Sequence, residues 1–376
     1  MSRLSNFLMA PLIDPDSKSS THGDSIFVLD GIRGLAVLIV IASHTQAFGM
    51  SGQGTLGVLL FFFLSGFVLT LPYAHEPQRL AKGSELFRFA ASRVLRIVPI
   101  YLVAVAVITW MLQQNINWFL VNVLFLKGWN HLWSVAEEAR FYLLFPLAIC
   151  ITALLPGWLP RLLFLCVLTY LAYVYGGFHT IDMLNGHHVS FYFWMFTGGM
   201  LTCFLYRCPI FSKITQARPL AYLFGAGALV TLALVFLTSN ELVEHFWKPL
   251  IPRLPDNLVL NGMARPGAWF FMFFLMVYGA TTFTRSWANW LLQAPFLRHM
   301  GLLSYSLYLF HVPIMMKLSN LGLTREALFI VVLAISWVVA WFSYILVEKP
   351  FLGMKPHFEK PNAEIIQNGL YVRKPT

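Results

Sequence analysis

Residues 55–73 read Thr-Leu-Gly-Val-Leu-Leu-Phe-Phe-Phe-Leu-Ser-Gly-Phe-Val-Leu-Thr-Leu-Pro-Tyr and contain no charged side chain. About 20 predominantly apolar residues are what an α-helix needs to cross the hydrocarbon core of a bilayer. The whole chain of 376 residues has the same character, since 58% of it is hydrophobic and 11% is charged. Soluble domains carry about 45–50% and about 25% of such residues, so the sequence predicts an all-α polytopic membrane protein.

Similar apolar stretches recur along the chain and indicate about ten transmembrane helices. Residues 118–130 are apolar but short, which favours an interfacial or re-entrant segment. We expect a polar N-terminal tail over 1–25, a membrane-embedded domain over 26–351 and a C-terminal tail over 352–376. The candidate spans are residues 31–49, 55–73, 97–113, 137–156, 162–177, 190–206, 219–238, 267–284, 301–318 and 327–347.

The basic residues indicate which side of the membrane each loop faces. Ten spans place both termini on one side, and if that side is the cytoplasm the cytosolic segments hold 19 Lys and Arg against 6 on the outer side. Cytoplasmic loops carry such an excess, so both termini are predicted to be cytoplasmic. The same bias explains the formal net charge of +10 better than nucleic acid binding does. We therefore expect a multi-pass protein of the inner (plasma) membrane and no nucleic acid partner.

The first predicted span carries two ionisable side chains, Arg33 and His44, eleven residues apart. At about 3.6 residues per turn they share one face, and at about 1.5 Å per residue they lie roughly 16 Å apart along the axis. In the predicted topology Arg33 lies near the cytosolic mouth and His44 lies deeper. Ionisable residues within spans usually serve a function. A snorkelling arginine and a histidine bonded between helices are the structural alternative.

A second pair of cations, Arg93 and Arg96, stands just before Pro99 at the cytosolic end of the third span. Their i, i+3 spacing places them on one face if the segment is helical. Two guanidinium groups at this boundary can hold phosphate groups bidentately. The alternative is that they serve topology alone or bind anionic lipid head groups.

The fourth span begins with polar side chains at helical spacing. Ser134 and Glu138 are i, i+4 neighbours, and Glu137 can meet Arg140 in an internal ion pair. Ionised groups that enter an apolar span are costly unless they line a polar cavity. A helix cap at the interface is the alternative interpretation.

The ninth span presents Ser304, Tyr308 and His311 on one face, at i, i+4 and i+7. The tenth span ends at Glu348, which precedes Lys349 and Pro350. Because proline disfavours helical conformation in the residue before it, Glu348 is predicted to be a plain helix-end residue.

The predicted outer loop 178–190 gathers His179, Asp182, His187 and His188. These are zinc-ligand types, but their spacing fits neither a helix face nor a metal motif. We interpret them as solvated loop residues and expect no metal.

In this order, the polar segments resemble the acyltransferase family 3 of integral-membrane O-acyltransferases, over residues 26–351. Many members carry a doubled acid in the fourth segment, whereas here Ala139 and Arg140 follow Glu138. The matching segments are Leu29-Asp30-Gly31-Ile32-Arg33-Gly34 with His44, Gly57-Val58-Leu59-Leu60-Phe61-Phe62-Phe63-Leu64-Ser65-Gly66-Phe67, Arg93-x2-Arg96 with Pro99, His131-Leu132-Trp133-Ser134-x3-Glu138-x2-Phe141-Tyr142, Ser304-Tyr305-Ser306-Leu307-Tyr308-x2-His311-x-Pro313 and Glu348-Lys349-Pro350.

The resemblance implies an enzyme, an acyl-CoA-dependent O-acyltransferase. Members of the family take an acyl group, often acetyl, from acyl-CoA on the cytosolic side and pass it to a hydroxyl, commonly on a glycan, at or beyond the membrane. We accordingly expect acetyl-CoA as donor, a glycan or lipid-linked carbohydrate as acceptor, and membrane lipids as partners. The family's motif positions fall on Arg33, His44, Arg93, Arg96, Ser134 and Glu138.

Acyl transfer to an alcohol needs a base for the hydroxyl proton, stabilisation of the oxyanion and a grip on the CoA phosphates. Histidine titrates near neutrality, so His44 is the candidate base, and Glu138 is expected to orient either His44 or the acceptor. Direct transfer is favoured over an acyl-enzyme, because no Cys or Ser stands beside a base in the sequence. The residues expected to bind acyl-CoA are Arg33, Arg93 and Arg96, and those expected to bind substrate are Ser134, Tyr308 and His311.

Two alternative functions remain. A structural or scaffold membrane protein would have no need for ionisable residues aligned in three helices. The other alternative is a secondary transporter of a small polar or anionic solute. It would also place His, Arg and Glu at cavities between helices. Transporters more often carry internal repeats and broken helices, and the sequence shows neither clearly.

Overall fold

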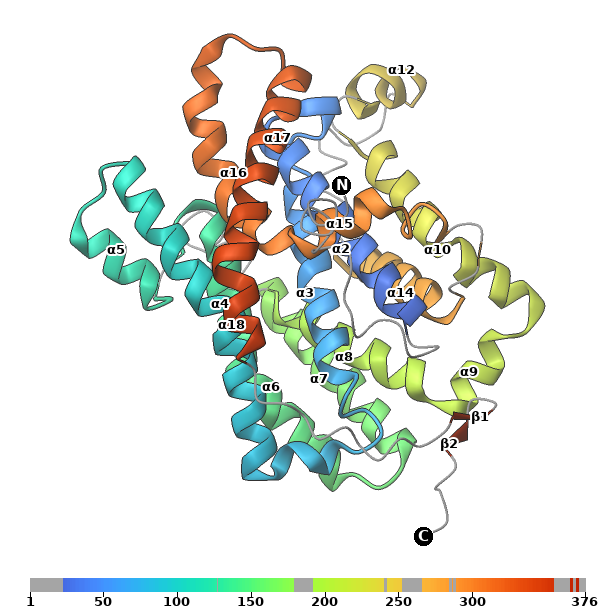
Figure 1. Ribbon diagram of the computed structural model, residues 1–376. Helices are drawn as coiled ribbons and strands as arrows, with labels where there is room; N and C mark the ends of the chain where they lie inside the picture. Colours follow the sequence, from blue (N-terminus) through green and yellow to red (C-terminus); the bar gives the residue numbers. More distant parts are fainter. Residues whose placement is uncertain are drawn as a thin grey trace, which may run out of the picture.

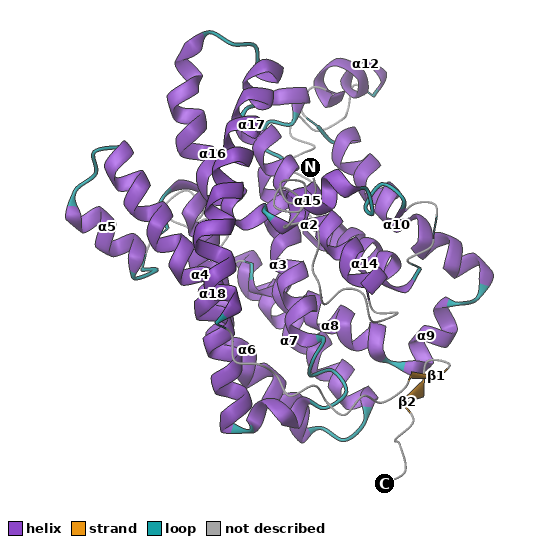
Figure 2. Ribbon diagram, viewed as in Figure 1, coloured by secondary structure: helices purple, strands orange, loops and turns teal. Residues whose placement is uncertain are grey.

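The structure is a computed structural model that describes residues 23–126, 128–178, 192–239, 242–251, 266–283, 286, 289–354, 366–367 and 370–371. Figure 2 shows that this part is built almost entirely of helices. Its strands are Ile366–Gln367 (β1) and Leu370–Tyr371 (β2), which pair antiparallel. The predicted helical membrane protein is thus confirmed at the level of secondary structure.

A helix lies at each of the ten predicted spans. In the described residues, five segments are long and apolar enough to cross a membrane: Phe27–His44, Gly83–Met111, Trp158–Tyr175, Arg218–Leu237 and Arg325–Gly353. The count of ten spans therefore stays a prediction. The ten helices are α2 (Gly23–His44), α3 (Gly54–Thr70), α4 (Gly83–Met111), α6 (Trp133–Leu154), α7 (Trp158–Phe178), α8 (Phe193–Arg207), α10 (Arg218–Leu237), α14 (Pro266–Thr282), α16 (Ser304–Leu318) and α17 (Arg325–Ser343).

Shorter helices connect these elements. The first part of the predicted short segment at 118–130 lies in α5, an eight-residue helix at Ile116–Val123. Helix α17 continues through the π-helical turn η10 (Tyr344–Glu348) into α18 (Lys349–Gly353). The others are α9 (Pro209–Thr215), α12 (Lys248–Leu250), α15 (Pro295–Leu302), the 3-10 turns η2 (Ala47–Gly49), η3 (Pro77–Ala81), η4 (Asn130–Leu132) and η9 (Ser319–Leu321), and the π-helical turn η7 (Val243–Trp247).

Helix α2 lies in the middle of the bundle, between α3 and α15, as Figure 1 shows. Glycines allow the backbones at these interfaces to approach closely. A Cβ atom at Gly34 would lie 1.9 Å from the carbonyl oxygen of Leu297 on α15, and one at Gly66 on α3 would lie 1.9 Å from that of Phe196 on α8. Small residues at helix interfaces are typical of membrane proteins, where close packing drives association.

Aromatic rings fill the space between α3, α6 and α8. Phe62 stacks on Phe196 with ring centroids 4.4 Å apart, and Phe141 stacks on the same ring at 4.2 Å. All three side chains are buried. This core fixes α3 and α6 against each other, and these two helices carry much of the site.

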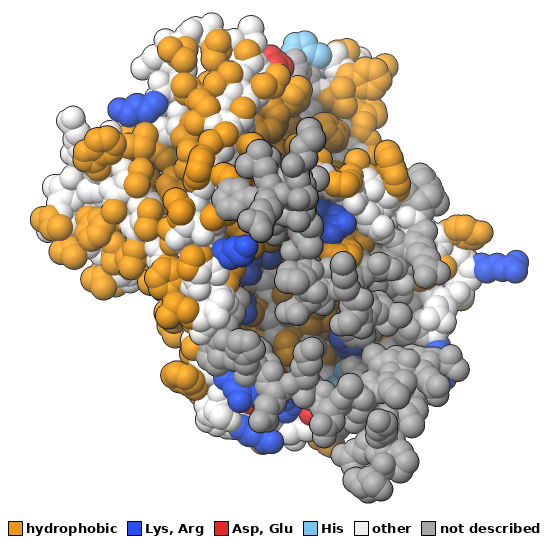
Figure 3. Space-filling view, in the orientation of Figure 1, with side chains coloured by type: hydrophobic (Ala, Val, Ile, Leu, Met, Phe, Trp, Pro, Cys, Tyr) orange, Lys and Arg blue, Asp and Glu red, His pale blue; other side chains and the backbone are white. Residues whose placement is uncertain are grey.

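Large hydrophobic side chains also point outward, among them Trp110, Leu143, Leu171 and Ile330 on α4, α6, α7 and α17. Figure 3 shows hydrophobic side chains crowding the part of the visible face formed by α5, α16 and α17, with Lys and Arg more frequent lower down. Soluble monomers rarely expose so much contiguous apolar surface. The surface is that expected of a protein surrounded by lipid.

Candidate active site

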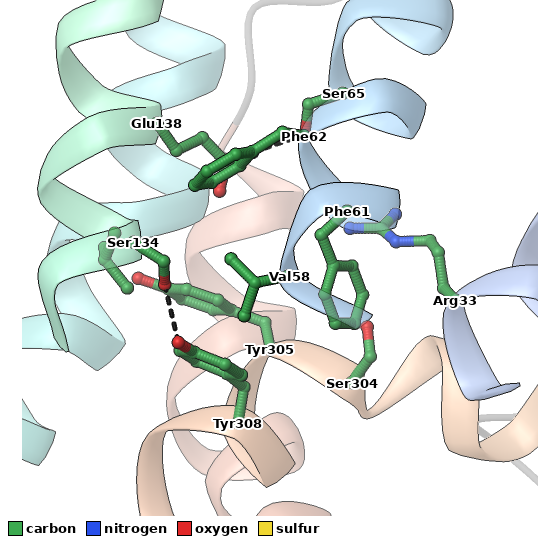
Figure 4. Close-up of a pocket in the computed structure, with 11 residues that line it drawn as sticks. Arg33, Val58, Phe61, Phe62, Ser65, Ser134, Glu138, Ser304, Tyr305 and Tyr308 are labelled. Carbon is green, nitrogen blue, oxygen red and sulfur yellow. Dashed lines mark hydrogen bonds between the residues drawn. The ribbon is translucent and has the colours of Figure 1, made fainter. Parts of the chain in front are cut away.

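Two adjoining cavities lie between α2, α3, α4, α6 and α16. The cavity on the side of Tyr308, here called the inner cavity, has a volume of about 40 Å³. The cavity on the side of Arg93 and Arg96, here called the outer cavity, has a volume of about 360 Å³, and the two meet at Arg33, Phe61, Ser65 and Glu138. Figure 4 shows the inner cavity, with Arg33 entering from α2 on the side opposite Ser134 and Glu138 of α6. The inner cavity is lined by Arg33, Val58, Phe61, Phe62, Ser65, Ser134, Val135, Glu138, Ser304, Tyr305 and Tyr308.

The three arginines singled out in the sequence meet at the outer cavity. Arg93 and Arg96 come from one face of α4, as their i, i+3 spacing predicts, and Arg33 comes from α2. The Arg93 guanidinium lies 5.9 Å from the centroid of the Tyr142 ring. Salt bridges within the described residues involve none of these three arginines. Asp30 and Glu138 line the same cavity, so its lining joins three guanidinium groups, which are donors suited to phosphate oxygens, with two carboxyl groups.

Glu138 lies at the junction of the two cavities and accepts two hydrogen bonds. The hydroxyls of Ser65 and Tyr142 each donate to its Oε1 over 2.6 Å. No hydrogen bond joins Glu138 to His44 among the described residues, so an orienting contact to that histidine is not present here. A role of Glu138 toward the acceptor stays a prediction.

Ser134 and Tyr308 face each other across the inner cavity. The Ser134 hydroxyl donates to the Tyr308 hydroxyl over 2.7 Å (Figure 4), and the Tyr308 hydroxyl donates to the backbone oxygen of His131 over 2.7 Å. The two side chains are separated by 174 residues in the sequence. The structure thus brings together two predicted substrate-binding residues through a direct contact.

His44 and His311 lie one helical turn of α16 beyond Tyr308. His44 Nδ1 and His311 Nε2 are 3.1 Å apart, and the ring centroids of Tyr308 and His311 are 5.7 Å apart. His311 is fully buried, whereas His44 is partly exposed. His311 does not line the cavities at Arg33, so its place in the site is beside His44.

Several residues of the site carry no assigned role in the sequence prediction. Ser65, Tyr142 and Tyr305 line the cavities. Ser65 is the one hydroxyl amino acid in the middle of an uncharged run of Phe and Leu, a signal that could have marked it. Tyr142 follows Glu138 by four residues, which is contact distance on a helix.

The expectation for Glu348 is wrong. Its side chain is buried, and its Oε1 accepts a hydrogen bond of 2.5 Å from the Ser306 hydroxyl of α16. The π-helical turn η10 carries the chain through this position, so proline at 350 does not end the helix at Glu348.

The expected pair of Glu137 with Arg140 is confirmed, with 3.0 Å between nitrogen and oxygen.

The possible metal ligands His179, Asp182, His187 and His188 lie outside the described residues. Within the part of the chain that is described, no group of three or more His, Cys, Asp or Glu side chains is arranged to hold a metal ion.

Comparison with known proteins identifies the family to which these motifs belong. Residues 26–348 match the family model described as an acyltransferase domain. The chain belongs to this family. The resemblance drawn from the motif order is thereby confirmed, and the cavities described above lie inside the matched region of this acyltransferase domain.

Curated relatives of this acyltransferase-domain protein are found in Staphylococcus aureus. The O-acetyltransferase OatA of strain NCTC 8325 is 27% identical over 366 residues, which cover 86% of this chain and 56% of OatA. A putative O-acetyltransferase of strain COL is 24% identical over 368 residues, with the same coverage of each chain. The chain thus spans about half the length of the curated relatives it matches. No solved structure matches it.

Proposed function

We propose that this protein is a membrane O-acetyltransferase, which moves an acetyl group from cytosolic acetyl-CoA to a hydroxyl of a glycan or lipid-linked carbohydrate. The observation that carries the proposal is the pair of adjoining cavities, which begins at three arginines and ends at Tyr308, one turn from His311 and His44. Family membership and the names of the S. aureus relatives support the reaction type.

The arginines account for binding of the donor. Arg33, Arg93 and Arg96 present planar forks of N–H donors that match phosphate oxygens bidentately. Arg33 and His44 stand roughly 16 Å apart on α2, a gap that the extended pantetheine arm bridges while the phosphates stay at the arginines. The thioester then arrives beside the histidines.

The chemistry that follows is a direct transfer. His44 Nε2 takes the proton of the acceptor hydroxyl as its oxygen attacks the thioester carbonyl carbon, which gives a tetrahedral oxyanion. As this intermediate collapses, the C–S bond breaks, and the CoA sulfur leaves and takes the proton back from His44. The products are an acetyl ester and CoA with a free thiol.

The proposal includes a topology of ten spans. In this topology the protein lies in the plasma membrane and both of its termini are in the cytoplasm. In that arrangement the arginines face the cytosol, where acetyl-CoA is made, and the C-terminal end of α2 with His44 faces the other side. Carbohydrate acceptors outside the cell would then meet the acetyl group at His44.

The test is acetyl transfer by purified protein in lipid nanodiscs with acetyl-CoA labelled in the acetyl group. We expect CoA release and labelled product with membrane glycan extract, and loss of both in a folded His44→Ala protein. Turnover at the wild-type rate in that variant would refute the base assignment. Accumulation of a solute in vesicles without CoA release would establish the transporter instead. Mass analysis of surface glycans before and after deletion identifies the acceptor.

Donor binding offers a separate prediction. Arg93→Ala/Arg96→Ala removes two phosphate ligands, and because charge-assisted hydrogen bonds contribute about 1.5–3 kcal/mol each, we expect the Kd of acetyl-CoA to rise at least tenfold. Lys213→Ala, an exposed cation on α9, is the control and should leave the Kd unchanged. An unchanged Kd in the double variant would show that the two arginines serve topology and do not bind the donor.

A further inference from the structure

We propose that His311 is the positioning residue of a histidine dyad, which fixes the tautomer of His44 and stabilises the protonated form of that base. The inference deepens the proposed function and rests on it, because it assigns a partner to the candidate base. It stands on the hydrogen-bond geometry of two side chains that come from α2 and α16, 267 residues apart.

The first step is to establish which nitrogen of the neutral His311 ring carries the hydrogen. Its Nδ1 lies 2.8 Å from the backbone oxygen of Tyr308 and 3.2 Å from that of Leu307. Carbonyl oxygens only accept hydrogen bonds, so Nδ1 must carry the hydrogen. In a neutral imidazole the other nitrogen is then an acceptor. His311 therefore presents the lone pair of Nε2 to His44.

The second step follows for His44. Its Nδ1 lies 3.0 Å from the backbone oxygen of Val40 and 3.1 Å from His311 Nε2. Both neighbours are acceptors, so Nδ1 of His44 carries its hydrogen. The lone pair is consequently on Nε2 of His44, the nitrogen that neither neighbour occupies and that a general base needs.

The third step concerns the charge that appears when His44 Nε2 takes a proton. The Nδ1–H of the resulting imidazolium points at His311 Nε2, which can share or accept that proton. His311 would then have both nitrogens protonated, with Nδ1–H still directed at the oxygens of Tyr308 and Leu307. Every proton keeps an acceptor throughout. A buried carboxylate orients the histidine of a catalytic triad and stabilises its imidazolium without taking the proton, and here a neutral imidazole stands in the corresponding place.

The surroundings of the dyad are neutral. The rings next to His311 are those of Tyr308 at 5.7 Å and of His131 at 5.3 Å between centroids. His131 Nε2 lies 3.0 Å from the backbone oxygen of Leu309 and therefore carries its hydrogen. No salt bridge of the described residues reaches these three histidines. The tautomer of His44 thus depends on the backbone of α2 and on His311.

The test compares two variants that imitate different halves of the imidazole. The amide of Gln reaches the place of Nε2 and can offer an acceptor to His44, whereas the amide of Asn ends near Nδ1 and cannot. We expect His311→Asn to lower kcat by about 100-fold or more, the usual scale for a general base that is poorly placed. His311→Gln should stay within about tenfold of wild type. The KM for acetyl-CoA should be unchanged in both, because the arginines bind the donor.

The control is His75→Asn, which alters a histidine packed on Trp158 outside the site and should leave kcat unchanged. Wild-type kcat in His311→Asn, or equal losses in folded Gln and Asn variants, would overturn the dyad. If His44→Ala loses turnover while His311→Asn keeps it, the role of His311 is refuted and His44 can still be the base. If His44→Ala keeps normal turnover, the assignment of His44 as the base is refuted.

A second readout does not depend on turnover. Nitrogen chemical shifts of histidine-labelled wild-type protein report which ring nitrogen of His44 carries the hydrogen, with His44→Gln used to assign the signal. We expect Nδ1 protonated and Nε2 unprotonated at neutral pH. A wild-type His44 with its hydrogen on Nε2 would overturn the inference.

Discussion

At the scale of single residues, the carboxylate of Glu138 depends on two hydroxyls for its position. Tyr142→Phe removes one of two hydrogen bonds of 2.6 Å, and a bond to a charged group contributes about 1.5–3 kcal/mol. We expect turnover to fall about tenfold, since about 1.4 kcal/mol corresponds to that factor. Steady-state CoA release measures it. Tyr222→Phe, an exposed ring on α10, should have no effect, and equal rates for both variants would contradict the prediction.

Spacing along one helix predicted neighbours well, but it could not predict partners from different helices. The i, i+3 pair Arg93 and Arg96 shares a cavity, as expected. The contact of His44 with His311 crosses 267 residues and that of Ser65 with Glu138 crosses 73. Such contacts depend on how helices are placed against each other, which helical periodicity does not encode. The order of the motifs predicted which residues belong to the site, and the fold shows which of these residues are in contact.

At the scale of elements, the approach of α2 to α15 requires a glycine. In Gly34→Ala the new Cβ would lie 1.9 Å from a backbone oxygen, which no side-chain rotation can relieve. Overpacking of this kind costs about 1–3 kcal/mol or more, so the thermal midpoint in nanodiscs should fall. Gly83→Ala is the matched control, because a Cβ there meets nothing within 4 Å. Equal midpoints in the two variants would show that the helices can move apart freely.

Arg140 joins α6 to the turn that follows α5. It donates to the backbone oxygens of Phe125 and Leu126 and pairs with the buried carboxylate of Glu137. In Arg140→Ala that carboxylate loses its counter-charge; the cost is less than the about 3–5 kcal/mol of a fully buried pair, because the Arg140 side chain is 32% exposed. We expect a drop in the thermal midpoint and partial recovery in Glu137→Gln/Arg140→Ala. Failure of the double variant to recover would assign the loss to the backbone contacts.

At the scale of the whole molecule, the topology can be tested from both sides of the membrane. In a background without the four native cysteines, Asn320→Cys lies after α16 and Lys213→Cys lies in α9, both on exposed positions. The charge bias predicts that an impermeant thiol reagent labels the first in intact cells. The second should react only after permeabilisation. The reverse labelling pattern would show that the topology is the opposite of the predicted one. The donor and acceptor would then be assigned to the opposite sides of the membrane.

The number of spans shows where prediction from composition ends. Helices such as α3 and α16 have 17 and 15 residues, fewer than the about 20 that cross a bilayer unaided. Their ends are set by packing: α16 is held to the end of the last long helix by the Ser306 bond to Glu348. Hydrophobicity predicted where helices occur. The lengths and ends of the helices depend on contacts with neighbouring helices, which the sequence alone does not reveal.

Tyr308 has a consequence for the electrical integrity of the membrane. Its phenol is held by two hydrogen bonds of 2.7 Å and lines the inner cavity on the side of the two histidines. A cell that acetylates carbohydrate outside must move an acyl group across without short-circuiting its proton gradient. The pantetheine arm of the proposed donor has to pass this ring to reach His44, so the hydrogen bonds that hold the ring must open when the donor enters and can form again when it leaves. On the proposed function, the phenol thus narrows the path between the arginines and His44 whenever no donor occupies it.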